Sequence, residues 1–327
     1  MTAEIPSKRE RIAGTAKRLA IREYAPFGGW ILSWFFIGLA LGHADAVRLL
    51  AVNGFVQSIR QICTVEAMQV LGRRTGLEKS IYKAARKVAV RIEGIFLLVW
   101  LTATAGLVAL LHYRGFGEPA GMLAIASLGI AARNPFSLIV AKLDRGISWR
   151  LGSAATFVIG SGLVFLFGLP WWAAAIALAA RDWGGLISTI LFGPERSASD
   201  ASRDPMTFAE TARRTEMSAR QQLSYRLISS VATLTMGPFG KFVARTSREV
   251  GRLDSRLARL VPRKKSGFLL FTAVTLGAAI SALFVAREPS TLLASAAFTR
   301  LGASGLVVLL WWRFAGDPAE DDFMDDE

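Results

Sequence analysis

The stretch AIALAARDWGGLIS, residues 175–188, places an arginine and an aspartate side by side in an otherwise apolar segment. The apolar segment runs from Trp171 to Gly193. A helix of roughly 20 apolar residues is long enough to cross the hydrocarbon core of a bilayer. Arg181 and Asp182 would then lie near the middle of the membrane, where a charged side chain is costly and usually marks a pathway, a ligand site or a specific partner.

The composition of the 327-residue chain extends this expectation to the whole molecule. Hydrophobic residues make up 52% of the sequence and the mean hydropathy is +0.39, values that are high for a soluble protein. The net charge is +14, and most of the 39 basic residues lie between the apolar segments. We therefore expect an integral membrane protein whose partners are membrane lipids, especially anionic ones, and no nucleic acid.

The sequence gives little support to metal or cofactor chemistry. Cys63 is the single cysteine, and His43 and His112 are the two histidines. There is no Walker A motif, no paired-aspartate motif for magnesium and no evident pair of nucleophile and base. We expect no metal, no cofactor and no catalytic residue, so a non-enzymatic role is favoured.

Seven apolar segments are clear in the sequence. They are residues 30–44, 94–111, 120–141, 153–169, 171–193, 267–286 and 290–312. Residues 46–71 are an eighth candidate, which hydropathy alone would miss because the segment contains Arg48, Arg60 and Glu66. If this segment crosses the membrane, the basic N-terminus and the basic residues of 73–91 lie on the same side, as the positive-inside rule favours.

We therefore predict an all-α fold, a polytopic transmembrane helical bundle of about eight spans (six plus two). Both termini would be cytoplasmic, and the membrane would be the plasma (bacterial inner) membrane. The expected organisation is a basic N-terminal segment, a six-span bundle, a basic amphipathic cytoplasmic linker, a two-span hairpin and an acidic disordered tail. These parts occupy residues 1–29, 30–193, 194–265, 266–313 and 314–327.

The second predicted span has a polar face. Its polar residues recur every three or four positions, the spacing of one side of a helix. They are Asn53, Gln57, Arg60, Gln61 and Thr64. This face is expected to look into the bundle or a wet cavity; the alternative is an amphipathic helix that lies in the membrane interface.

Each predicted span that runs from outside to inside carries an arginine near its centre. These residues are Arg60, Arg133, Arg181 and Arg300. Four such charges facing lipid would cost on the order of 10 kcal/mol, so they should face inward. A planar guanidinium suits phosphate because it donates two parallel hydrogen bonds.

We therefore expect a substrate-binding layer that includes these four arginines together with Asp182, Gln57 and Asn53. In this arrangement Arg181 faces a cavity, and Asp182 faces a neighbouring helix, toward Arg133 or Arg300. Two alternatives remain open: structural ion pairing within the bundle or between protomers, and an incorrect assignment of the spans.

A basic stripe follows Gly240 in the predicted linker. Its residues recur every three or four positions and are Lys241, Arg245, Arg248, Arg252, Arg256, Arg259 and Arg263. The stripe is typical of a helix that binds the surface of an anionic leaflet. The alternative is a solvated helix that pairs with a protein partner.

The order of the first six spans resembles one six-helix lobe of the polysaccharide and lipid-linked-oligosaccharide flippases, the MATE-like exporter superfamily. The resemblance covers residues 30–193. It rests on KLDRGISWRLGSAATFVIGSGLVFLFGLPWWAAAIALAARDWGGLISTILF, residues 142–192, where a short basic inner loop precedes a helix, a tight outer turn and another helix. Such flippases have two lobes, so the resemblance implies a homodimer or a partner membrane subunit, and movement of a lipid-linked anionic substrate without ATP hydrolysis.

Three functions follow from these observations. The first is binding, and by extension flipping or transport, of an anionic phosphate-bearing lipid or lipid-linked glycan. The second is a non-catalytic membrane scaffold or partner subunit. The third is a lipid-modifying membrane enzyme without a recognisable motif. A lipid-accessible cavity at mid-depth favours the first, whereas a dry bundle with every arginine paired favours the second.

The predicted topology can be tested at Ser80. Because the basic segment 73–91 is expected in the cytoplasm, Ser80→Cys in a Cys63→Ser background should react with a membrane-impermeant thiol reagent only after the cells are opened. Labelling of intact cells would contradict the eight-span assignment.

Overall fold

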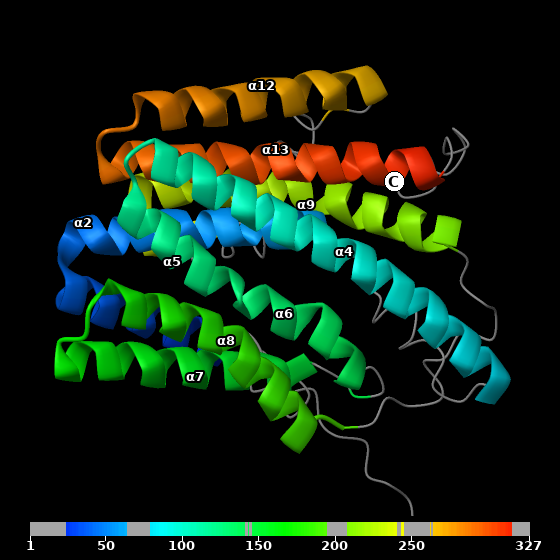
Figure 1. Ribbon diagram of the computed structural model, residues 1–327, viewed down its shortest axis with the longest axis horizontal. Helices are drawn as coiled ribbons and strands as arrows, with labels where there is room; N and C mark the ends of the chain where they lie inside the picture. The colour runs from blue at the N-terminus through cyan, green and yellow to red at the C-terminus, as the bar shows by residue number, and fades with distance from the viewer. Residues whose placement is uncertain are drawn as a thin grey trace, which may run out of the picture.

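The computed structural model describes residues 24–63, 79–140, 143, 146–194, 208–240, 243–244, 262 and 264–315. Helices make up the regular structure of these residues (Figure 1). In chain order they are α2 (Ala25–Cys63), α4 (Lys79–Tyr113), α5 (Gly117–Ser127), α6 (Gly129–Arg133), the 3₁₀ turn η2 (Pro135–Val140), α7 (Gly146–Phe167), α8 (Trp171–Phe192), α9 (Phe208–Met236), the 3₁₀ turn η4 (Gly237–Phe239), α12 (Lys265–Val285) and α13 (Pro289–Ala315). The prediction of an all-helical bundle is confirmed for this part of the chain.

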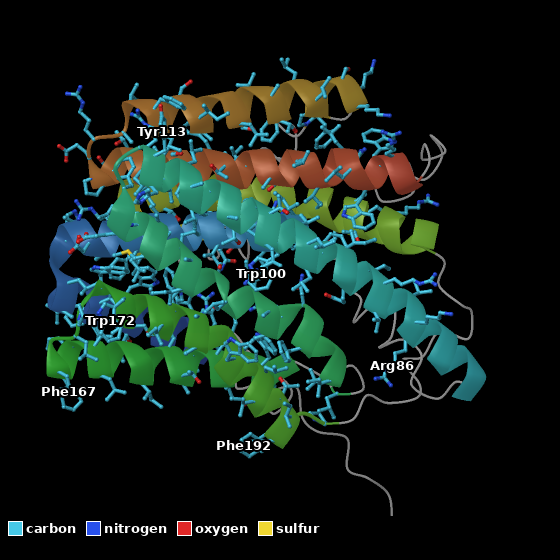
Figure 2. All side chains as sticks on the ribbon, viewed as in Figure 1. Arg86, Trp100, Tyr113, Phe167, Trp172 and Phe192 are labelled. Atoms are coloured by element: carbon cyan, nitrogen blue, oxygen red, sulfur yellow. The ribbon has the colours of Figure 1, made fainter. Side chains whose placement is uncertain are left out.

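Six of the helices are long and apolar enough to cross a membrane: α2, α4, α7, α8, α12 and α13. Their outer surfaces are apolar, with Leu98, Val285 and Phe192 exposed by 66%, 70% and 74%. Such a surface is unfavourable in water and favourable in lipid. Figure 2 shows Tyr113 and Phe167 at one end of the bundle, as expected for aromatic residues near a membrane interface. The six apolar helices therefore indicate a multi-pass integral membrane protein.

Helix α2 is interrupted at Gly42, whose positive φ of 79° favours glycine. The chain reverses direction there (Figure 1). The first half lies along α7, where Phe36 stacks on Phe165, and the second half lies along α13, where Gln61 contacts Ser304. The residues predicted as the first two spans thus form two packed halves of α2, although residues 64–71 lie outside the described part.

The predicted fourth span, residues 120–141, is not one continuous helix. It consists of two helices, α5 and α6, with Leu128 between them. Helix α6 ends at Arg133, because Asn134, which precedes Pro135, leaves the helical conformation. Proline supplies no backbone N–H and clashes with the preceding helical turn, which explains the change to the 3₁₀ turn η2. The side-chain amide of Asn134 donates a 2.7 Å hydrogen bond to the backbone carbonyl oxygen of Cys63. This bond connects the end of α6 to the end of α2.

The hairpins α7–α8 and α12–α13 pack closely because small residues lie between their helices. A Cβ atom at Gly184 of α8 would overlap Thr156 of α7, and one at Gly305 of α13 would overlap Thr272 of α12. Small residues let helix backbones approach in a membrane, where lipid provides no hydrophobic force between helices. This close contact fixes α8 against α7, and with it the position of Arg181 and Asp182.

Helix α9 falls within the predicted cytoplasmic linker, and it packs along α13 (Figure 1). Near the middle of α9, the Arg220 guanidinium lies 4.1 Å from the ring centroid of Trp312 and 5.0 Å from that of Phe268. Arg220 also forms an ion pair with Glu216. These contacts anchor a polar helix to the α12–α13 hairpin.

The packing at Gly184 predicts a specific cost. Gly184→Ala should lower the stability of the detergent-purified protein by about 1–3 kcal/mol, because the added methyl group overpacks the α7–α8 contact. Gly106→Ala is the matched control, since a Cβ atom at Gly106 in α4 meets no atom within 4 Å. Equal thermal unfolding midpoints for the two variants would contradict this packing.

Candidate anion-binding site

The centre of the site is the carboxylate of Asp182, whose side chain is 3% exposed. It accepts a hydrogen bond of 2.9 Å from Nε of Arg133 on α6 and one of 3.3 Å from an Nη atom of Arg181. Of the two neighbours that the sequence suggested for Asp182, the structure thus places Arg133 beside it. It also pairs Asp182 with Arg181, although adjacent helical residues point about 100° apart.

Two glycines explain how the carboxylate reaches this position. Gly129 of α6 leaves room for the backbone of Ala179 on α8 and lies beside the Asp182 carboxylate. Gly185 of α8 leaves room for Ser153 and Trp149 of α7. Helix α8 is therefore held between α6 and α7, with Asp182 directed at the first of them.

Aromatic rings position the two arginines that contact Asp182. The Arg133 guanidinium lies 5.1 Å from the ring centroid of Trp149, and that of Arg181 lies 5.8 Å from the ring centroid of Phe157. Attraction between a cation and an aromatic face strengthens where water is excluded. The two rings therefore restrict the positions of both guanidinium groups.

Arg181 and Arg133 border a cavity of about 400 Å³. The lining combines arginines with aromatic and small side chains. It comprises Pro26, Phe27, Trp30, Gln57, Arg60, Arg133, Trp149, Arg150, Ser153, Ala154, Phe157, Arg181 and Tyr225. The cavity thus has four arginines in its wall, supplied by α2, α6, α7 and α8.

The structure brings most of the predicted binding residues together. Arg60 and Gln57 of α2 face the cavity with Arg133 and Arg181, and the charges of Arg133, Arg181, Asp182 and Arg300 all act on Arg60. Asn53 is buried behind this wall, where its side-chain oxygen accepts a 3.4 Å hydrogen bond from Gln57. The prediction that the polar face of residues 46–71 turns into the bundle is confirmed for the residues up to Cys63.

Arg300 is close to this cavity but is not part of its wall. It lies on α13 and donates a 3.4 Å hydrogen bond to the Ser229 hydroxyl of α9. Sequence reasoning did not anticipate this neighbour, because α9 was assigned to a cytoplasmic linker. The seven basic residues predicted to bind a lipid surface, from Lys241 to Arg263, lie outside the described residues.

Most of the other residues of the cavity wall were not predicted, among them Trp149, Arg150 and Tyr225. Arg150 precedes the predicted apolar segment 153–169, and the structure places it within the first turns of α7. Tyr225 lies on α9, whose low hydropathy suggested a position outside the bundle. Nothing in the local sequence indicates that Tyr225 lies near Arg60 of α2.

Comparison with family models, curated proteins and solved structures finds no match to this chain. What the fold and the site define is a class: a multi-pass helical membrane protein with an arginine-lined cavity between its helices.

Because Asp182 forms two buried ion pairs, its carboxylate should contribute to the stability of the folded protein. Asp182→Asn should lower the stability by about 3 kcal/mol, because removing one partner of a buried pair leaves the other charge uncompensated. Asp45→Asn is the matched control: its pair with Arg48, at 2.7 Å, is accessible to solvent and should contribute at most about 1 kcal/mol.

Arg181→Gln should be milder than Asp182→Asn, because the carboxylate keeps its contact with Arg133. Thermal unfolding in detergent ranks the three variants. If Arg181→Gln is the most destabilising of them, Asp182 is not the group that neutralises this layer.

Proposed function

We propose that this membrane protein binds the anionic headgroup of a phosphate-bearing lipid or lipid-linked glycan in the arginine-lined cavity. The observation that carries the proposal is the charge of the cavity wall. Four arginines line it, and the Asp182 carboxylate, which pairs with two of them, is buried and does not line the cavity. A phosphate in the cavity would bring negative charge to this wall.

Arginine chemistry supports phosphate as the anion. The guanidinium fork donates paired hydrogen bonds to phosphate oxygens, and bonds between charged groups are about twice as strong as neutral ones. A volume of about 400 Å³ lies within the range of about 300–1,000 Å³ for small-molecule sites. Trp30, Phe27 and Tyr225 add apolar surface for the part of the ligand beyond the phosphate.

The depth of the cavity supports movement of the lipid as an extension of the proposal. Arg181 is the eleventh residue of the 22-residue helix α8, so it lies about 16 Å along the helix at 1.5 Å per residue. A headgroup held at Arg181 is about half way across a hydrocarbon core of about 30 Å. The cavity extends from there to Phe27 and Arg150, in the first turns of α2 and α7. A site at this depth fits a flippase or transporter better than a surface lipid receptor.

We further propose eight crossings, with the two halves of α2 counting as two and the broken α5–α6 segment as one. The turns at Gly42, 114–116, 168–170 and 286–288 would face outward, because they carry few basic residues. Both termini would then be cytoplasmic, in a bacterial inner membrane. The resemblance to one flippase lobe adds the proposal that a second copy or a partner membrane subunit completes the transporter.

Lipid binding to the purified protein tests the proposed function. Titration with short-chain phosphatidic acid, followed by native mass spectrometry, should show that Arg181→Gln weakens binding by about tenfold or more, since a hydrogen bond to a charged group contributes about 1.5–3 kcal/mol.

Arg287→Gln is the matched control, because Arg287 is an exposed arginine in the α12–α13 turn and should bind lipid as the wild type does. The proposal is wrong if Arg181→Gln is folded and binds phosphatidic acid with wild-type affinity.

A further inference from the structure

Helix α9 runs antiparallel to α13, and its contacts follow one another in order along both helices (Figure 1). The Arg220 guanidinium lies 4.1 Å from the ring centroid of Trp312, near the end of α13. Farther along α9, the Ser229 hydroxyl accepts a 3.4 Å hydrogen bond from Arg300, near the middle of α13. Helix α9 therefore extends from the end of the bundle where α13 finishes to the middle of a membrane-spanning helix.

The last turns of α9 lie beyond this middle level. Arg300 is about 16 Å from the start of α13, so it lies near the centre of a hydrocarbon core of about 30 Å. Met236, the last residue of α9, is seven residues beyond Ser229, or about 10 Å farther along the helix. The end of α9 thus lies inside the core, about 5 Å from its far boundary.

The chain turns back directly after α9. Gly237 has a positive φ of 57°, which favours glycine, and Pro238 has no backbone N–H that would need a partner in lipid. A Cβ atom at Gly240 would overlap the carbonyl oxygen of Ala232, although eight residues of continuous helix extend over about 12 Å. Gly240 therefore lies beside α9 and does not prolong it.

Pro262 and the start of α12 lie back at the first end of the bundle. A Cβ atom at Gly267, in the first turn of α12, would lie 2.9 Å from the Cβ atom of Pro262. Phe268 of the same turn contacts Trp312, with ring centroids 6.3 Å apart. The chain thus enters and leaves at the end where α13 finishes. We call it the inner end, and the proposed topology places it in the cytoplasm.

The exposed side of the last third of α9 is apolar. Val231, Leu234 and Met236 are exposed by 55%, 38% and 53%. The Thr235 hydroxyl, also on this side, donates a hydrogen bond to the backbone carbonyl of Val231 and needs no partner outside the helix. On the opposite side Ser229 is fully buried. The polar side of α9 thus faces protein, and its other side is suited to lipid.

We propose that α9 is a re-entrant helix, which enters the membrane from the inner end, reverses within the hydrocarbon core at residues 237–240 and leaves at the same end. Irregular backbone at this depth requires burial in protein or a water-filled cavity, and Gly240, whose N–H donates to the Gly237 carbonyl, is buried. Helix α9 also carries Tyr225 into the cavity wall, so part of this wall comes from a segment that does not cross the membrane.

This inference is independent of what the cavity binds. It also leaves the eight proposed crossings unchanged, because a re-entrant segment begins and ends on the same side of the membrane.

Spin labels measure the depth of α9 directly. Leu234→Cys in a Cys63→Ser background is labelled in the full-length protein in lipid nanodiscs, and its collisions with lipid-soluble oxygen and water-soluble NiEDDA are compared. Ile176→Cys is the matched control: this exposed residue of α8 lies about 8 Å outward of Arg181, as Leu234 lies about 8 Å outward of Ser229. The two labels should show the same preference for oxygen. A preference for NiEDDA at Leu234 alone would make α9 a surface helix and overturn the proposal.

Thiol labelling separates a re-entrant helix from a complete crossing. Phe239→Cys, at an exposed position of the turn, should not react with a membrane-impermeant maleimide in intact cells, whereas Glu288→Cys in the proposed outer turn should react. Met217→Cys, exposed near the inner end of α9, should react only after the cells are opened. Reaction of Phe239→Cys in intact cells would show a complete crossing and overturn the proposal. Val231→Cys replaces Leu234→Cys in the depth measurement if that variant does not fold.

Tyr225→Cys tests the cavity wall and separates this inference from the proposed function. It should react with a small charged thiol reagent, because Tyr225 lines the cavity, whereas Leu234→Cys should not. An unreactive Tyr225→Cys would overturn the assignment of α9 to the cavity wall. Phosphatidic acid should slow the reaction at Tyr225→Cys. If it does not, and the label at Leu234 keeps its depth, the proposed function is wrong and the re-entrant helix stands.

Discussion

The buried carboxylate of Asp182 is the group on which the centre of this bundle depends. It is nearly inaccessible, and it joins Arg133 of α6 to Arg181 of its own helix. A lone carboxylate at this depth would be strongly unfavourable, and so would the two arginines without it. The three groups are therefore tolerated together, and the helices that carry them must remain in register. Glycines at 129, 184 and 185 permit that register by letting α8 approach α6 and α7.

The same helices bring further arginines close to this carboxylate. They come from α2, α6, α7, α8, α9 and α13, and Asp182 pairs with two of them. Lipid-facing placement is excluded by its cost, so the arginines line a cavity or gather behind it. The aromatic rings beside Arg133 and Arg181 hold the guanidinium groups in place. A cavity wall lined by arginines favours binding of an anion, and the phosphate headgroups of membrane lipids are such anions.

Apolar runs and charge placement predicted much of this arrangement. They indicated the membrane helices, the inward polar face of residues 46–63 and the convergence of Arg60, Arg133 and Arg181. They did not identify the partner of Asp182, because Arg133 and Arg300 lie at similar depths and only the packing of α6 on α8 distinguishes them. They also did not place α9 within the bundle: its low hydropathy hides the fact that its polar residues face α2 and α13 rather than lipid. Tyr225 and Arg226 were missed for that reason.

The most direct measurement is an experimental structure of the full chain, purified in mild detergent with its bound lipid and determined by electron cryomicroscopy. We predict density for a phosphate headgroup in the cavity bounded by Trp149, within hydrogen-bond distance of Arg181 and Arg60. Lipid headgroups found only at the two ends of the helices, with the cavity arginines paired to carboxylates of the protein itself, would contradict it.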